Sequence, residues 1–165
     1  MFDFRPDTAL AKPELYRQLN EAAAALVAGE PDEIANMANV AALMAEFLPE
    51  LNWAGFYRAI GSELVLGPFV GRPACIRIPF GRGVCGTAAA EARTQIVPDV
   101  HAFPGHIPCD AASRAELVVP VMRDGRVSAV IDLDSPVPDR FDAEDARGIE
   151  QLAAMLAAHR TATAG

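Results

Sequence analysis

The first third of the chain carries apolar side chains at helical spacing. Between residues 13 and 29 they recur every three or four positions, which predicts an amphipathic helix. The same spacing predicts a second helix from about Asp32 to Leu48, and Pro49 ends it. We therefore expect two helices over about residues 13–48.

After these helices the pattern changes to the two-residue period of β-strands. Trp53–Ile60 and Glu63–Val70 are rich in β-branched and aromatic residues, and the short Gly61-Ser62 link between them predicts a hairpin. Two more strand-like segments, with a short helix between them, complete the middle of the chain. The strands are expected at residues 75–80 and 94–97, and the helix at residues 84–92.

The C-terminal third combines a hairpin with a helix. Two strand patterns, residues 116–122 and 127–134, flank a turn at Arg123-Asp124-Gly125. The last helix begins near Asp142, which is a favourable N-cap residue. The apolar face of this helix consists of Ile149, Leu152, Ala153 and Leu156.

The order of the predicted elements indicates the fold class. Consecutive hairpins give an antiparallel sheet, and the amphipathic helices need a sheet face on which to pack. We therefore expect a single α+β domain over residues 1–165, with a frayed tail at residues 160–165.

One long segment, residues 98–113, fits neither a helix nor a strand. It contains three prolines, one glycine and two histidines. A long irregular segment inside a compact domain is usually functional or disordered. Because Cys109 lies within it, we expect a function.

The register of the last hairpin decides which side chains share a face. If Asp124-Gly125 alone forms the loop, Leu117 lies opposite Asp132 and each face mixes apolar with polar residues. If the loop has three residues, with Gly125 in a left-handed bulge, Leu117 pairs with Ile131 and one face is wholly apolar. We therefore expect the bulged, three-residue turn.

This register gathers acidic side chains. Glu116 lies opposite Asp132, and Asp134 lies on the same face two residues further along. Like charges directly opposed are unfavourable, so that a ligand ammonium group or the uptake of a proton by one carboxyl is needed to offset them. The alternative is a solvated acidic face at the edge of the sheet.

Composition limits the classes to which the chain can belong. It is 52% hydrophobic and 22% charged, which is the balance of a packed globular core. A net charge of −8, with few clusters of Lys and Arg, argues against binding to nucleic acid. No apolar run approaches the roughly 20 residues that span a bilayer, and the N-terminus lacks a signal-peptide pattern. We therefore expect a cytoplasmic protein that binds neither nucleic acid nor membrane.

The three cysteines, Cys75, Cys85 and Cys109, are the candidates for covalent chemistry. None lies in the C-x-x-C spacing of a zinc site, so we expect no bound metal. Cys85 follows a glycine-rich turn at a predicted helix start, where the helix dipole favours the thiolate. Cys109 lies near His106 in the irregular segment, whereas Cys75 begins a strand and suits simple burial. Several thiols without a metal suggest redox exchange, in which one thiol reacts and a second resolves the product as a disulfide.

Cys109 and the two histidines allow other interpretations. With His101 or His106, Cys109 has the residue types of a Cys–His hydrolase pair, although no hydrolase signature accompanies them. The same three residues are also the donors of a metal-binding regulator, although their spacing matches no standard zinc pattern.

Four segments of the chain resemble a known family. They lie between about Ile34 and Glu150 and read IANMANVAALMAEFLPELNWAGFY, LVLGPFVGRPACIRIPFGRGVCGTAAAE, TQIVPDVHAFPGHIPCDAASRAELVVPV and VIDLDSP. The C-G-T-A and F-P-G-H-I-x-C-D-A-A-S patterns within them are not carried by ordinary GAF sensor domains. The chain resembles the free methionine-(R)-sulfoxide reductases, which are single-domain enzymes of the GAF fold. The resemblance implies a GAF-like antiparallel sheet and the reduction of free L-methionine-(R)-sulfoxide to L-methionine.

The resemblance also implies roles for the cysteines. Cys109 matches the cysteine that attacks the sulfoxide and becomes a sulfenic acid, and Cys75 matches its usual resolving partner. Cys85 matches a third family cysteine, with either a resolving or a substrate-contacting role. No bound cofactor is implied, because thioredoxin supplies the reducing equivalents, and relatives suggest a homodimer.

A substrate pocket is implied in the same way. Trp53 and Tyr57 match aromatic residues that line it, and Trp53 would hold the S-methyl group against its face. Glu116, Asp132 and Asp134 match carboxylates that hold the substrate ammonium and assist protonation of the sulfoxide oxygen. The substrate ammonium would be the cationic ligand that offsets the repulsion among the crowded carboxylates. Without the resemblance, both aromatic residues would be interpreted as core.

One residue departs from the family pattern. Pro108 stands where many relatives have a small residue before the cysteine, and it removes one backbone N–H from the loop. The other loop amides remain available to the substrate carboxylate. The competing function is a non-enzymatic GAF sensor that binds a small ligand in the same pocket, and the three family cysteines argue against it.

Overall fold

The computed structural model describes residues 9–105 and 111–159. These ranges contain four α-helices, one short 3₁₀ helix and six β-strands. The helices are α1 (Lys12–Val27), α2 (Glu33–Phe47), α3 (Gly83–Glu91) and α4 (Ala143–Ala158), with the 3₁₀ helix η1 at Val100–Ala102. The strands are β1 (Trp53–Ile60), β2 (Glu63–Gly71), β3 (Arg77–Pro79), β4 (Gln95–Val97), β5 (Ala115–Arg123) and β6 (Arg126–Ser135).

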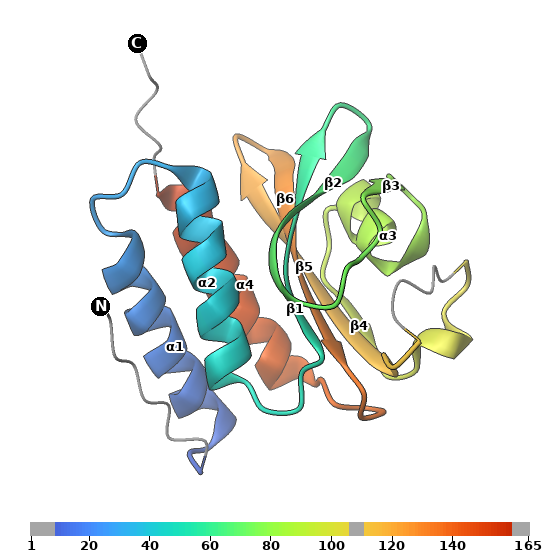
Figure 1. Cartoon of the computed structure of the whole chain (residues 1–165), viewed down its shortest axis with the longest axis horizontal. Coiled ribbons are helices and arrows are strands. Elements are labelled where there is room, and N and C mark those ends of the chain that lie inside the picture. The colour runs from blue at the N-terminus through green and yellow to red at the C-terminus, as the bar shows by residue number, and fades with distance from the viewer. Residues whose placement is uncertain (1–8, 106–110, 160–165) are drawn as a thin grey trace.

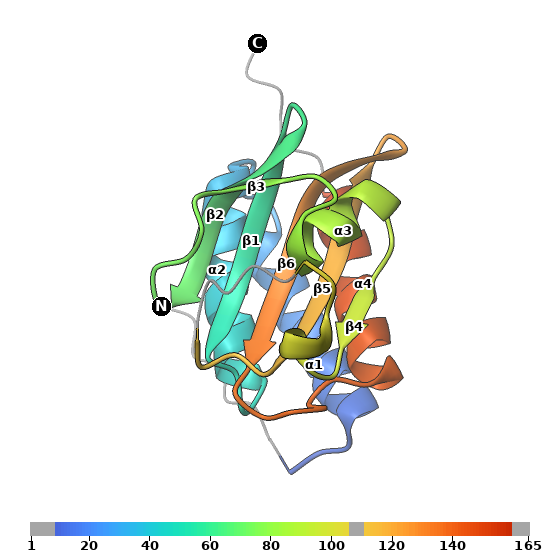
Figure 2. The same cartoon turned by 90° about the vertical axis from the view of Figure 1, so that its right-hand side faces the viewer.

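The strands form one antiparallel sheet in the order β3-β2-β1-β6-β5-β4. Figure 1 shows α1, α2 and α4 together on one face, and Figure 2 shows α3 in front of the other. Each face has its own hydrophobic cluster, the helix face around Leu19, Met44 and Phe56, and the α3 face around Trp53 and Val84. This arrangement confirms the predicted α+β class, with helices packed on an antiparallel sheet.

A buried acid at the start of α4 joins this helix to α1. Asp142 is the N-cap, as predicted: its side chain accepts from the backbone N–H of Asp145, whose own side chain accepts from the N–H of Asp142. Asp145 also accepts from the hydroxyl of Tyr16 at 2.8 Å and from the ammonium of Lys12 at 2.6 Å. The guanidinium of Arg140 completes the group at 3.3 Å. The amphipathic helices are therefore held by ion pairs as well as by their apolar faces.

Most elements lie within one or two residues of their predicted bounds. The third strand, expected at residues 75–80, is shorter and covers Arg77–Pro79, and the irregular segment 98–113 contains the single turn of η1. The predicted frayed tail lies outside the described residues. None of the helices in the described ranges has the length and apolar composition needed to cross a membrane.

The β5–β6 hairpin has a different turn from the one expected. Asp124 and Gly125 alone form the loop, with φ of 49° and 74°, and Arg123 pairs with Arg126. Positive φ at both central residues is the mark of a type I′ turn, whose twist matches that of the two strands. The predicted three-residue turn is therefore wrong.

A bulge further along β6 nevertheless restores an apolar face. Ser128 is the extra residue, because the register shifts after Val121, and its hydroxyl donates to the carbonyl of Val121 at 3.1 Å. Leu117 consequently lies opposite Leu133 rather than Ile131. The pairing is two residues from the predicted one, and because two is the period of a strand the same side chains still face the helices.

Candidate active site

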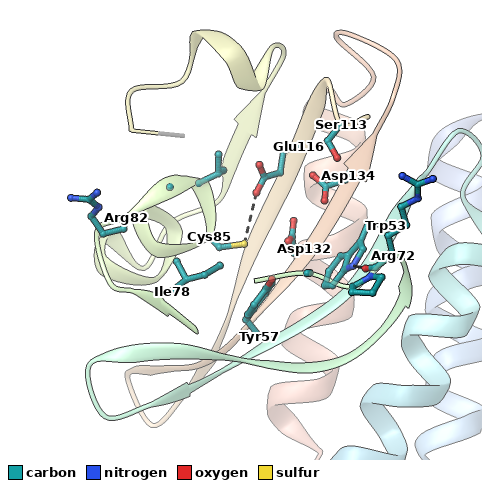
Figure 3. Close-up of a pocket in the computed structure, with 14 residues that line it drawn as sticks. Trp53, Tyr57, Arg72, Ile78, Arg82, Cys85, Ser113, Glu116, Asp132 and Asp134 are labelled. Atoms are coloured by element: carbon teal, nitrogen blue, oxygen red, sulfur yellow. Dashed lines mark hydrogen bonds between the residues drawn. The ribbon is translucent and has the colours of Figure 1, made fainter. Parts of the chain in front are cut away.

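A pocket opens on the α3 face of the sheet, where β1, β5 and β6 face the start of α3 (Figure 3). Aromatic side chains form one part of its wall, and a thiol and three carboxylates form another. The predicted site residues that line it are Trp53, Tyr57, Cys85, Glu116, Asp132 and Asp134. The fold therefore brings together residues that are spread over about half of the sequence.

The register of β5 and β6 directs the three acids into this pocket. Glu116 lies opposite Asp134, and Asp132 follows on the same face of β6 two residues away. The predicted pairing of Glu116 with Asp132 is wrong, but the predicted gathering of the carboxylates is confirmed. Glu116 is 7% exposed and Asp132 is 6% exposed, and within the described residues neither forms an ion pair.

Burial raises the pKa of both carboxyls. The pKa of Asp132 rises to about 7 because burial disfavours its charge, and hydrogen bonds to Cys85 and Glu116 offset only part of this effect. The pKa of Glu116 lies well above its ordinary value because of burial and of the neighbouring charges of Asp132 and Asp134. A carboxyl proton is therefore available near neutral pH for transfer to a bound group.

Cys85 is a buried, neutral thiol. It is the third residue of α3 and is 4% exposed, and its Sγ donates to Oε1 of Glu116 over 3.8 Å. Burial raises the pKa of the thiol well above its usual value, and the charges of Asp132 and Glu116 raise it further. The expected thiolate is therefore wrong, because burial and two carboxylates outweigh the dipole of a nine-residue helix.

Trp53 forms a fixed aromatic wall. Its ring stacks on Phe69, with centroids 5.2 Å apart, and on Tyr57 at 5.9 Å. Its indole N–H donates to the carbonyl of Arg72 at 3.2 Å. The φ of 141° at Gly71 brings the backbone so close that a Cβ there would lie 2.6 Å from the indole. The orientation of Trp53 is therefore set by two ring contacts, by the close backbone at Gly71 and by the hydrogen bond of its indole N–H.

Of the other two cysteines, Cys75 is the one that the described residues include. Cys75 is half-buried and disulfide-bonded, and it directly follows Ala74, which does line the pocket. Cys109, the predicted nucleophile, lies outside the described residues, as do its neighbours His106 and Pro108. Among the described residues, the free cysteine is Cys85.

Sequence reasoning missed three polar residues of the pocket, Arg72, Arg82 and Ser113. Ser113 is 3% exposed and accepts a hydrogen bond from the amide of Asn52 at 3.0 Å. It ends the F-P-G-H-I-x-C-D-A-A-S pattern, so its place in the motif was a usable signal. Arg72, whose carbonyl holds Trp53, follows a strand end and carries no comparable mark.

One set of side chains has the arrangement of metal ligands. Sγ of Cys85 and carboxylate oxygens of Glu116 and Asp132 all lie within 4.8 Å of one another. The sequence did not predict this set, because its members come from three different elements. The alternative metal site at Cys109 and its two histidines falls partly outside the described residues.

Known proteins with matching sequence or structure lead to the same family. The GAF domain model matches residues 34–159. The free methionine-R-sulfoxide reductase of Escherichia coli is 51% identical over 145 residues, which cover 88% of this chain and 88% of that protein. The enzyme of the same name from Saccharomyces cerevisiae is 42% identical over 155 residues, covering 89% of this chain and 86% of that protein. The X-ray structure of the Neisseria meningitidis free methionine-R-sulfoxide reductase in complex with its substrate is 45% identical, with a TM-score of 0.91 over 95% of this chain and 94% of that chain.

These matches extend over most of both chains in each case and include the segments that form the pocket. The chain therefore belongs to the free methionine-R-sulfoxide reductase family of GAF domain proteins.

Proposed function

We propose that the chain reduces free L-methionine-(R)-sulfoxide to L-methionine. The observation that carries the proposal is the pair of buried carboxyls, Glu116 and Asp132, which face an aromatic wall and have no cationic partner among the described residues. A buried acid of this kind is stabilised by a cationic ligand. Relatives about half identical to the chain carry the name of this activity, which supports the choice of ligand.

The pocket suits a free amino acid with an apolar sulfur substituent. The ammonium group would lie among Glu116, Asp132 and Asp134, and the S-methyl group would lie against the face of Trp53. A peptide-bound methionine sulfoxide has no ammonium, and its binding would leave buried acids without a partner, which is costly. Selectivity for the free amino acid follows from this difference.

The chemical step requires a thiolate and a proton donor. The thiolate of Cys109 attacks the sulfoxide sulfur while the sulfoxide oxygen takes a proton from the coupled Glu116 and Asp132 pair. The protonated oxygen then passes to the sulfur of Cys109, the bonds from the substrate sulfur to that oxygen and to the sulfur of Cys109 break, and methionine departs. The substrate sulfur gains the electron pair that Cys109 loses in becoming a sulfenic acid. Because burial raises the pKa of Asp132 to about 7, this carboxyl can hold a proton near neutral pH, which supports the Glu116 and Asp132 pair as the proton donor.

Cys75 then resolves the product. Its thiol displaces the sulfenic oxygen as water and forms a disulfide with Cys109, which thioredoxin reduces by thiol–disulfide exchange. The disulfide-bonded state of Cys75 and the buried, protonated state of Cys85 support this division of roles. Cys85 serves instead as the hydrogen-bond donor that orients Glu116. Thioredoxin as reductant and the homodimer are proposed from the family resemblance, and the cytoplasmic location is proposed from the sequence pattern.

The test is thioredoxin-coupled oxidation of NADPH with free L-methionine-(R)-sulfoxide as substrate. We expect turnover by the intact protein and its loss in Cys109→Ser. The N-acetylated sulfoxide, which lacks the ammonium, is the matched substrate and should have kcat/KM lower by about 10³-fold or more, as expected when buried polar groups lose their partner. Glu116→Gln should raise the KM for the free amino acid.

Three results would contradict the proposal. Turnover that survives in Cys109→Ser would move the nucleophile to another cysteine. No turnover by folded, reduced protein would leave a ligand-binding sensor as the function. Equal use of the free and N-acetylated sulfoxides would remove the proposed role of the carboxylates.

A further inference from the structure

Three potential metal ligands from three different elements converge in the pocket. Cys85 comes from the first turn of α3, Glu116 from β5 and Asp132 from β6. Their ligand atoms all lie within 4.8 Å of one another, and Sγ of Cys85 is 3.8 Å from Oε1 of Glu116. Figure 3 shows the three side chains pointing toward one another.

This spacing is close to that of a zinc coordination sphere. A tetrahedral zinc ion binds sulfur at about 2.3 Å and oxygen at about 2.0 Å, which keeps these two ligands about 3.5 Å apart. The observed 3.8 Å between Cys85 and Glu116 therefore requires a shift of only a few tenths of an ångström. One thiolate with two carboxylates favours Zn²⁺ or Cd²⁺ over Mg²⁺ or Ca²⁺, which prefer oxygen ligands throughout.

An unpartnered oxygen atom independently indicates a ligand at this position. Oδ1 of Asp132 is fully buried and has no hydrogen-bond partner among the residues that the structure describes. A buried acceptor without a partner is costly, and more so if it is charged, so such atoms are rare in folded proteins. The carboxyl of Asp132 is 6% exposed and opens into the pocket, where a cation can reach it.

The three ligands are held in place before any ion arrives. Glu116 and Asp132 lie on β5 and β6, and each residue is paired with a neighbouring strand on both sides. The first turn of α3 packs tightly on the segment around β3, because a Cβ at Gly86 would lie 2.4 Å from the carbonyl oxygen of Pro79. The N–H of Gly81 also donates to the carbonyl of Gly86 at 2.7 Å. Preorganised ligands of this kind lose little freedom on binding.

We propose that Cys85, Glu116 and Asp132 bind one thiophilic divalent cation of the zinc class, and that the bound ion closes the pocket to the amino acid substrate. The ion forms bonds to the sulfur of Cys85 and to oxygens of Glu116 and Asp132, and the thiol proton and any carboxyl proton leave to solvent. It then occupies the position at which the substrate ammonium would meet the carboxylates. Binding of the ion is independent of the proposed function, whereas inhibition rests on it.

Binding is tested first, in a protein whose other thiols are removed. In Cys75→Ser/Cys109→Ser, Cys85 is the remaining thiol. Titration with Cd²⁺ should produce an ultraviolet sulfur-to-cadmium charge-transfer band that saturates at one equivalent. Asp132→Asn and Glu116→Gln in this background should each weaken binding by about tenfold or more, the equivalent of about 1.4 kcal/mol.

The matched control removes one acid far from the pocket. Asp124→Asn changes an exposed residue of the β5–β6 turn and should leave Cd²⁺ affinity unchanged. No saturable band, or an equal loss of affinity in Asp124→Asn and Asp132→Asn, would overturn the site. Because two separate carboxylate variants are used, failure of one to fold leaves the other to decide.

Inhibition is tested in the intact, reduced enzyme. Zn²⁺ should raise the apparent KM for free methionine sulfoxide and leave kcat unchanged, and a chelator should restore the original value. A fall in kcat at constant KM would place the ion elsewhere and overturn the closure of the pocket. If the enzyme shows no turnover at all, the proposed function fails, and the Cd²⁺ titration still decides the metal site.

Discussion

Two buried acidic sites lie on opposite faces of the sheet and differ in what surrounds them. On the helix face, Asp145 is 0% exposed. It contacts Lys12 at 2.6 Å, Tyr16 at 2.8 Å and Arg140 at 3.3 Å. On the pocket face, Asp132 is 6% exposed, and its contacts in the described ranges are another acid and a thiol. One buried carboxyl is compensated by cations and a hydroxyl, and the other is not.

This difference separates a structural acid from a functional one. A buried charge is tolerated in a stable fold when cations and hydrogen-bond donors replace the water that it has lost. Asp145 meets this condition within the chain itself. Asp132 and Glu116 do not, so the fold stores there an unfavourable arrangement that a cationic ligand can relieve. The partners of a buried acid, rather than the degree of its burial, therefore distinguish the functional site from the structural one.

Removal of the compensated acid should have the largest effect on stability. Asp145→Ala leaves Lys12 and Arg140 without their buried partner, and we expect the free energy of unfolding to fall by about 3–5 kcal/mol. Urea unfolding followed by circular dichroism measures it. Glu144→Ala, an exposed neighbour in α4, is the control and should change stability by less than about 0.5 kcal/mol. Equal losses of stability in the two variants would mean that the ion pairs of Asp145 stabilise the fold no more than an exposed residue does.

Removal of the uncompensated acid, Asp132, should lower activity and leave stability unchanged. Asp132→Asn eliminates a buried carboxyl without a cation, so we expect no loss of stability at neutral pH. We expect kcat/KM for free methionine sulfoxide to fall by about 10²–10³-fold, because the proton donor pair and one substrate contact are lost. The coupled NADPH assay and urea unfolding of the same preparation check both halves. A destabilised variant with unchanged kcat/KM would reverse the assignment of the two acids.

The elements of the fold could be predicted because their signals are local. Helical spacing in α1 and α2, the Gly61-Ser62 turn and the cap at Asp142 each depend on residues a few positions apart. The β5–β6 turn was predicted wrongly because the local signal is ambiguous there. A bulge at Gly125 and a bulge at Ser128 give the same alternation of apolar residues, and periodicity alone does not distinguish them.

Part of the pocket lining was predicted from residue types, but the protonation states of its side chains were not. Sequence periodicity placed Glu116, Asp132 and Asp134 on one face, and the family resemblance supplied Trp53 and Tyr57. The protonated thiol of Cys85 could not be foreseen, because its partner Glu116 lies 31 positions away in the sequence. The pairing of Lys12 with Asp145, 133 positions apart, was invisible for the same reason.

The pH dependence of stability should reveal the uncompensated acid. The pKa of Asp132 is about 7 in the folded protein against an ordinary value of 3.8, so between these pH values the folded state holds a proton that the unfolded chain has lost. Stability should therefore fall as the pH rises through this range, with the full cost present above about pH 7. Relative to Asp132→Asn, we expect the intact protein to lose at least about 1.4 kcal/mol, the equivalent of one pKa unit, between about pH 5 and pH 8. Urea unfolding at both pH values measures this loss, and parallel pH profiles would assign the raised pKa to another group.

The smallest effect should come from the exposed edge of the compensated group. Asp142 caps α4 through the N–H groups of Glu144 and Asp145, and the ammonium of Lys12 lies 2.7 Å from its side chain and lowers its pKa to about 2. Asp142→Ala removes both the cap and the ion pair and should cost about 1 kcal/mol. Asp142→Asn keeps the cap and removes only the charge, and because this side chain is 55% exposed we expect a loss of about 0.5 kcal/mol or less. If chemical denaturation gave the same loss for both variants, the charge rather than the cap would stabilise the start of α4, and compensation on the helix face would extend to its solvent edge.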